Sequence, residues 1–200
     1  MTADHSTDRI APEDVARAEL YGFLATLLAA PPDAAMLARL AGLSGDEETR
    51  LGRAIAEIAA DAAGTDQTAA DREYTRLFIG LGRGEILPYA SHYLTGNLHD
   101  KPLSRLRGDM GRLGIARADD VSEPEDHIAS VCEMMAGLIT GRYGGPAPLE
   151  QQEAFFGVHL SPWAPRLFAD LEAAENARLY AGVGTLGLAF MEIESRAFDL

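Results

Sequence analysis

Apolar side chains recur at intervals of three and four residues along most of the chain. The first such stripe comprises Leu20, Phe23, Leu24, Leu27 and Leu28. This spacing places all of them on one face of an amphipathic helix. Pro12 and the two acids after it predict where that helix begins, because proline tolerates the first turn and acids favour the positive end of the helix dipole. Equivalent stripes follow at Leu51, Ile55, Ile58 and Ala59, at Tyr74, Leu77 and Phe78, and at Leu103, Leu106, Met110 and Leu113.

Helical spacing continues in the second half of the chain. Ser122 and Glu125 form a capping box, which predicts a helix start, and a Gly-Gly-Pro sequence at 144–146 predicts the end of that helix. Its apolar face comprises Ile128, Val131, Cys132, Met135, Leu138 and Ile139. Two further helices are predicted, one through Phe155, Phe156, His159 and Leu160, and one from about Pro165 to the end with Leu179, Val183, Leu186, Phe190 and Ile193 facing inward. We therefore predict an all-α fold, a single-domain bundle of about eight to ten helices over residues 12–200 after a flexible segment 1–11.

The helical period breaks at residues 80–96, which read GLGRGEILPYASHYLTG. Alternating glycines, a proline and several aromatic residues predict an ordered loop here. Compact domains seldom contain so long a loop unless it has a function, and this one is too aromatic for disorder. The loop is therefore a candidate binding element.

Composition narrows the function classes. The chain has 200 residues with 17 basic and 31 acidic side chains, a formal net charge of −14, which disfavours nucleic-acid binding. The acids gather between residues 118 and 141, where no Lys or Arg occurs, so we expect an acidic face. The lone cysteine, Cys132, has no disulfide partner and is predicted to be a small core residue. The polar N-terminus lacks the apolar region of a secretory signal, and the uncharged stretch 20–32 is too short to span a bilayer, so we expect a cytoplasmic protein without an integral membrane segment.

Other patterns give little support for enzymatic chemistry. The five histidines lack the spacing of metal ligands, and a single cysteine excludes a pair of cysteine ligands, so no metal or other cofactor is predicted. Gly80, Gly82 and Gly84 with Arg83 resemble a phosphate-binding loop but follow a helix rather than a strand. The alternative that stays open is a small acidic helical enzyme that binds a metal or a nucleotide through His92, His127 and these glycines.

Two segments together resemble a known family. The sequence Glu-Tyr-Thr-Arg-Leu-Phe at 73–78 runs into the glycine-rich loop with Pro88, Tyr89 and Tyr93, and a Glu-Pro-x-Asp-His motif follows at 123–127. This combination resembles the TorD/DmsD family of redox-enzyme maturation chaperones, which is more distantly related to NarJ. The later Phe155-Phe156, His159-Leu160 and Pro162-Trp163 pairs also fit, so the resemblance extends over about residues 12–195.

The resemblance implies an all-helical cytoplasmic chaperone without catalytic activity. Its partner would be the twin-arginine leader of a molybdenum-cofactor oxidoreductase precursor, held until the cofactor is inserted and the precursor is exported. The resemblance assigns Pro88, Tyr89, Ser91, Pro124, Asp126 and His127 to the leader-binding surface. It assigns Tyr74, Phe78 and Trp163 to supporting packing, and it leaves open a monomer or a dimer that exchanges helices.

The chemistry of such a leader agrees with these assignments. A basic pair followed by an apolar segment requires acids beside an apolar groove. We expect Glu123, Glu125 and Asp126 to meet the arginines, while Leu87, Tyr89 and Tyr93 line the groove. On the predicted helix, Asp126 would lie opposite the buried stripe and be exposed.

Overall fold

The protein is built from helices that pack around one continuous core. The computed structural model describes residues 10–80, 82–117 and 123–198. In these ranges the helices are α1 (Pro12–Ala29), α2 (Ala34–Ala41), α3 (Arg50–Ala63), α4 (Gln67–Tyr74), α5 (Ala90–Thr95), α6 (Lys101–Leu113), α7 (Ile128–Thr140), α8 (Leu149–His159), α9 (Ala164–Glu172) and α10 (Leu179–Phe198), and the π-helical turn η1 (Thr75–Ile79) follows α4 directly. The all-α prediction is therefore confirmed for the described residues. Most of the predicted segment 1–11 lies outside them.

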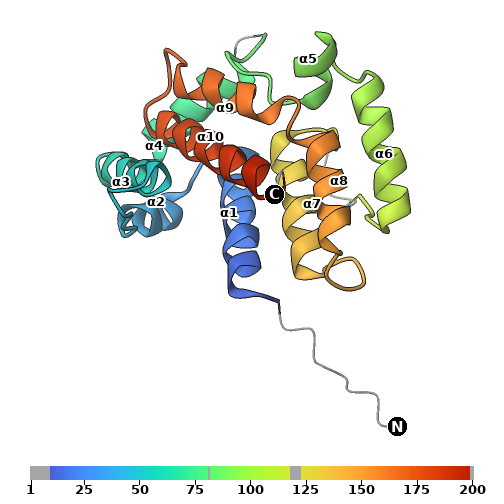
Figure 1. The fold of residues 1–200 in the computed structure, drawn as a ribbon. Coiled ribbons are helices and arrows are strands. Elements are labelled where there is room, and N and C mark those ends of the chain that lie inside the picture. Colours follow the sequence, from blue (N-terminus) through green and yellow to red (C-terminus); the bar gives the residue numbers. More distant parts are fainter. Residues whose placement is uncertain (1–9, 81, 118–122, 199–200) are drawn as a thin grey trace.

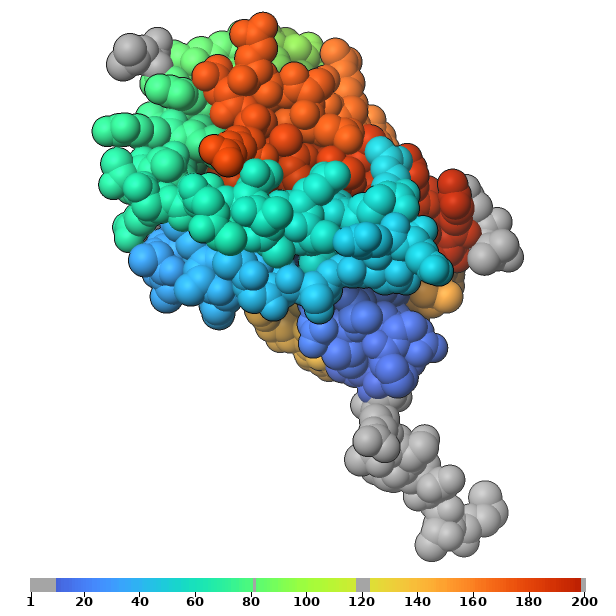
Figure 2. All heavy atoms as spheres, turned by 90° about the vertical axis from the view of Figure 1, so that its left-hand side faces the viewer, coloured from blue at the N-terminus to red at the C-terminus, as the bar shows by residue number. Residues whose placement is uncertain are grey.

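Three sets of helix contacts organise the bundle. The first helix, α1, lies beside α7, and α8 packs on the other flank of α7 (Figure 1). The last helix, α10, packs against α9 and α3 and reaches α1. Figure 2 shows α2, α3 and α4 covering one face between α9 and α1. The short helix α5 adjoins α6 at the opposite side of the molecule. No helix of the described residues is long and apolar enough to cross a membrane.

Most of the predicted core residues are buried, but Ile193 on α10, which was predicted to face inward, is 47 % exposed. Tyr74 is 8 % exposed and Trp163 only 1 %, and Phe78 packs against the same cluster, so all three are packing residues. Cys132 is completely buried, as predicted, and burial raises the pKa of its thiol. The indole Nε1–H of Trp163 donates to the carbonyl of His159, so the polar group of this buried side chain has a hydrogen-bond partner.

Several predicted boundaries are wrong. The last predicted helix is two helices, α9 and α10, separated by residues 173–178. The loop at 80–96 contains α5 within its second half. The helix predicted from Ser122 begins at Ile128, and it ends at Thr140 with Gly141 in the left-handed conformation rather than at 144–146. Ser122 itself lies outside the described residues.

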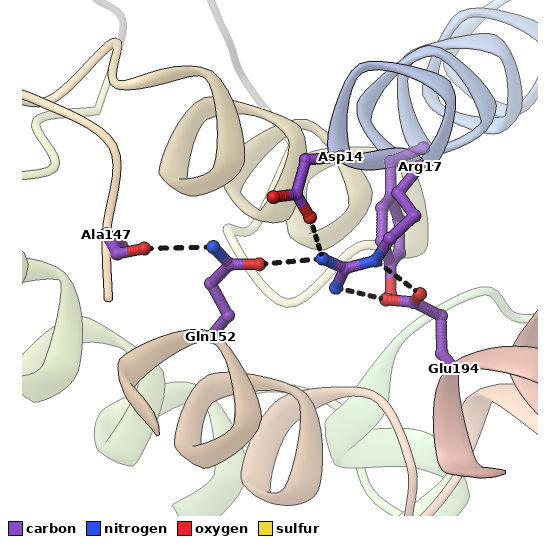
Figure 3. A network of polar contacts seen from close by, with 6 residues as sticks. Asp14, Arg17, Ala147, Gln152 and Glu194 are labelled. Carbon is purple, nitrogen blue, oxygen red and sulfur yellow. Dashed lines mark hydrogen bonds and ion pairs between the residues drawn. The ribbon is translucent and has the colours of Figure 1, made fainter. Parts of the chain in front are cut away.

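A buried polar network joins α1, α8 and α10 (Figure 3). Arg17 donates from Nε and Nη2 to the two carboxylate oxygens of Glu194 at 2.7 and 2.9 Å. The hydroxyl of Tyr21 donates to the same carboxylate at 2.9 Å, and Glu194 is fully buried. Nη1 of Arg17 also reaches Asp14 and Gln152, whose amide donates to the carbonyl of Ala147. The network therefore ties three helices that are far apart in sequence at one point.

Candidate functional site

The two segments that carry the motifs lie side by side. Tyr89 and His127 form an isolated antiparallel bridge. On either side of it, the amide of Ala90 donates to the carbonyl of Asp126 at 3.0 Å, and the amide of Ile128 donates to the carbonyl of Pro88 at 2.8 Å. The loop is therefore held against the start of α7 by backbone hydrogen bonds between residues almost forty positions apart in sequence.

Asp126 is not exposed, contrary to the prediction. Only 1 % of the residue is accessible, and its Oδ2 accepts the amide N–H of Ser91 at 2.8 Å, in the first turn of α5. The prediction was wrong because it placed Asp126 on a helix, whereas the residue lies in the turn that precedes α7. Its carboxylate therefore fixes the loop rather than presenting a surface charge.

Two buried polar atoms at this point have no hydrogen-bond partner within the described part of the chain. They are Oδ1 of Asp126 and Oγ of Ser91. Asp126 borders a cavity of about 100 Å³, which Arg105 and His159 also line. The other residues that line this cavity are apolar, so its polar groups come from Asp126, Arg105 and His159.

Asp126→Ala is expected to lower the free energy of unfolding by about 1–3 kcal/mol, because the Ser91 amide would lose its acceptor in a buried site. Urea unfolding followed by circular dichroism measures the change. Asp170→Ala is the matched control, since it removes an exposed carboxylate whose Oδ2 accepts the Tyr93 hydroxyl. Equal losses in the two variants would contradict a structural role specific to Asp126.

Glu125 is likewise committed to an internal ion pair. Its Oε2 accepts from Nε and Nη2 of Arg107 at 3.0 and 2.8 Å, and Arg117 lies 3.7 Å from Oε1. Burial opposes the charge, but the hydrogen bonds from Arg107 hold the pKa of Glu125 below its usual value. The expected acidic face is therefore reduced, since only Glu123 of the three acids in the motif is exposed.

Glu123 adjoins the aromatic part of the loop. The hydroxyl of Tyr89 donates to Oε2 of Glu123 at 2.5 Å, and burial together with this hydrogen bond raises the pKa of Tyr89. The ring of Tyr89 meets the imidazole of His127 edge to face, with centroids 5.1 Å apart. Pro124 lies in the intervening turn, where its carbonyl accepts the His127 amide.

His127 caps α7 and is held neutral. Its Nδ1 accepts the amide N–H of Ala129 at 3.2 Å, and the residue is 7 % exposed. Burial lowers the pKa of His127 to about 4, although the nearby Glu123 and Asp126 oppose that shift. Because Nδ1 is the acceptor, the proton of the neutral ring resides on Nε2.

The remaining loop residues face a different part of the molecule. Leu87 and Tyr93 line a recess of about 430 Å³ beside α9, together with Arg166 and Asp170. Tyr93 donates to Asp170 at 3.0 Å and lies against Trp163, with centroids 5.8 Å apart. Glu123 and His127 line a separate recess of about 540 Å³ between α1 and α7. Four predicted site residues thus line two separate recesses, Asp126 borders the smaller cavity, and Pro88, Tyr89, Ser91 and Pro124 line none of the three.

The α1 wall of the second recess was not predicted from the sequence. Gly22, Ala25 and Ala29 form that wall, with the exposed Thr26 beside them. Small residues on a helix also serve ordinary close packing, so their spacing alone gave no signal. These residues lie near Glu123 only because α1 packs against α7 in the folded protein.

The described histidines, which exclude His5, belong to no common cluster of possible metal ligands. Among the residues that the structure describes, no group of three or more His, Cys, Asp or Glu side chains is placed to hold a metal ion. Nε2 of His92 lies 3.4 Å from Nη2 of Arg83. Burial, Arg83 and Arg166 lower the pKa of His92.

Comparisons with known proteins agree on one family. The model of the nitrate reductase delta subunit family matches residues 44–169. The chaperone protein TorD of Vibrio cholerae is 29% identical over 134 residues, which cover 64% of this chain and 61% of that protein. The chain thus aligns with less than two thirds of that relative's length. TorD of Aliivibrio fischeri is 25% identical over 206 residues, covering 97% of this chain and 87% of the relative.

A solved structure shares the fold. The crystal structure of a putative redox enzyme maturation protein from Archaeoglobus fulgidus superposes with a TM-score of 0.55 at 24% identity, covering 90% of this chain and 93% of the other. The curated relatives are named as chaperones rather than as enzymes. The chain belongs to the nitrate reductase delta subunit family and to the TorD family that its motifs resemble.

Proposed function

We propose that the protein is a cytoplasmic maturation chaperone that binds the twin-arginine leader of a molybdenum-cofactor oxidoreductase precursor and holds it until cofactor insertion and export. The observation that carries this proposal is the match to TorD chaperones over most of the chain. The site geometry supports it. An exposed acid, Glu123, stands beside the aromatic ring of Tyr89 and at the edge of a recess lined by small residues. A basic pair followed by an apolar segment has the complementary chemistry.

Within this proposal, Glu123 takes the role of the arginine-binding acid. Asp126 is buried and accepts the Ser91 amide, while Glu125 is paired with Arg107. Glu123 is exposed, and the hydroxyl of Tyr89 orients its carboxylate. An incoming guanidinium therefore meets a charge whose position is already fixed, which lowers the entropic cost of ordering the side chain on binding.

Glu123→Gln is expected to weaken leader binding roughly three- to tenfold at low ionic strength and less at high ionic strength, because salt screens an exposed charge pair. Calorimetric titration at two salt concentrations measures both effects. Glu150→Gln on α8 is the control, since it removes an exposed charge remote from the motif. The same salt-dependent loss in both variants would show that only the net charge matters.

The function itself is tested by calorimetric titration with twin-arginine leader peptides from the molybdoenzymes of the same organism. Each peptide is paired with a control whose apolar segment is scrambled. Micromolar or tighter binding of one leader, with its scrambled control silent, supports the proposal and identifies the client. Failure of every leader to bind the folded protein would contradict it, and saturable binding of a metal ion or nucleotide would then favour the enzyme alternative.

A further inference from the structure

The recess between α1 and α7 has the size of a ligand site. Its volume of about 540 Å³ lies within the range of known binding pockets. The α1 wall is made of Gly22, Ala25, Thr26 and Ala29, and α7 supplies Ala129, Ser130, Glu133 and Ala136 on the other side. Seven residues along α1 span about 10 Å, so the recess is long enough for several residues of a bound peptide.

The packing within the protein does not explain why residue 22 is a glycine. It lies in the interior of α1, where glycine weakens a helix relative to alanine. A Cβ built at this position meets no described heavy atom within 4 Å. In contrast, a Cβ at Gly184 would lie 2.4 Å from the backbone nitrogen of Glu172, so that glycine is required by the packing of α10 on α9. The open space over Gly22 therefore permits the close approach of something outside the folded chain.

His127 supplies an unused hydrogen-bond donor at the same recess. The residue is more than nine-tenths buried and lines the recess. Its Nδ1 accepts the Ala129 amide, which leaves the proton on Nε2. This Nε2–H has no hydrogen-bond partner in residues 10–80, 82–117 and 123–198. A backbone carbonyl of a bound peptide is a suitable acceptor for such a neutral donor.

The charges around the recess indicate which residues a bound peptide would carry. The exposed carboxylate of Glu123 stands at the α7 N-terminal end of the recess, and the protein carries a formal net charge of −14. Further along α7, Glu133 is already paired with Arg142 at 2.6 Å. A basic residue is therefore favoured at one end only, with apolar residues beyond it.

We propose that the α1–α7 recess binds the apolar segment of the leader, with its basic end at Glu123 and a backbone carbonyl accepting the Nε2–H of His127. This inference rests on the proposed function and deepens it, since it assigns the apolar segment to α1 rather than to the recess lined by Leu87 and Tyr93. The small side chains of α1 let the peptide backbone approach closely, and the walls remove its apolar side chains from water.

The first test fills the recess. Gly22→Leu places a side chain in the open space and replaces a helix-interior glycine with a good helix former, so the fold should be at least as stable. We expect the affinity for the leader peptide bound by the unmodified protein to fall at least tenfold by calorimetry. Gly111→Leu is the control, because Gly111 also lies on a helix, α6, with no described atom within 4 Å of its Cβ, but outside the recess. Equal affinity of the Gly22→Leu variant and the unmodified protein would overturn the inference.

The second test removes the donor but keeps the cap. His127→Asn retains a side-chain oxygen that accepts the Ala129 amide, because asparagine is a good N-cap residue, and it lacks the Nε2–H. We expect a three- to tenfold loss of affinity with an unchanged circular dichroism spectrum, and unchanged affinity would overturn the role of the donor.

If the unmodified protein binds a leader and the Gly22→Leu variant binds it equally well, the placement of the leader in this recess fails while the proposed function stands. If the unmodified protein binds no leader, the proposed function fails first.

Discussion

Replacing Arg17 with methionine is expected to lower the free energy of unfolding by about 3–5 kcal/mol. The reason is the carboxylate of Glu194, which is fully buried and receives two of its hydrogen bonds from the Arg17 guanidinium. Without Arg17, only the Tyr21 hydroxyl would remain as a described donor to that charge. Methionine preserves most of the aliphatic volume, so the loss reflects the uncompensated charge rather than a cavity.

Arg50→Met is the matched control for this prediction. Arg50, at the start of α3, forms an ion pair at 2.8 Å with Glu192, which lies on α10 as Glu194 does. Both side chains of this pair are more than 40 % exposed. Exposed pairs of this kind contribute about 0.2–1 kcal/mol, so urea unfolding should separate the two variants clearly. Similar losses would contradict the assignment of Glu194 as a buried charge that depends on Arg17.

A double variant separates charge from packing. Arg17→Met combined with Glu194→Leu removes both charges and fills the site with apolar groups. Buried ion pairs replaced in this way often regain most of the lost stability. We therefore expect the double variant to be more stable than Arg17→Met alone, with a strongly non-additive cycle. A double variant that is less stable than either single variant would indicate that packing, not charge, dominates.

The helices were predictable because each buries an apolar face whose spacing is visible in the local sequence. The break between α9 and α10 was not predictable, because the residues that cause it lie far away in the sequence. Oε1 of Glu73 accepts the amides of Arg178 and Tyr180 at 2.7 and 2.9 Å, at the start of α10. Glu85 likewise accepts the amide of Glu175 at 2.7 Å. Carboxylates from α4 and the loop thus satisfy backbone amides that a continuous helix would have satisfied itself.

In the candidate site, too, contacts between residues far apart in sequence were not predictable. Its two segments were identified from their motifs, and the structure brings them together through the bridge between Tyr89 and His127. The exposure of Asp126 was predicted wrongly because the residue was placed on a helix, whereas it lies in the turn before α7 and is covered by the loop. Once the loop is in place, Asp126 is the acceptor for Ser91 and Glu123 is the exposed acid. Motif residues were therefore predictable, but their division into structural and surface roles required the tertiary contact.

Acidification from about pH 7 to about pH 4 is expected to lower the free energy of unfolding by about 3 kcal/mol through His127. The pKa of His127 is about 4 in the folded protein, and that of an unfolded histidine is about 6.5. Between these values the unfolded chain binds a proton that the native protein does not, so stability rises with pH. This contribution is complete above about pH 6.5 and is lost as the pH falls toward about 4.

His127→Asn tests this prediction because asparagine keeps the cap and does not titrate. Urea unfolding across this pH range should show a pH-dependent loss that is about 2–3 kcal/mol smaller than in the unmodified protein. The groups that face His127, namely Glu123, Asp126 and Tyr89, are unchanged in this comparison. His99→Asn makes the same exchange at an exposed residue with a φ of 60°, which asparagine tolerates, and is the control for the substitution itself. An identical pH dependence in all three proteins would show that the buried ring of His127 does not control the acid lability, and that the cap of α7 survives protonation.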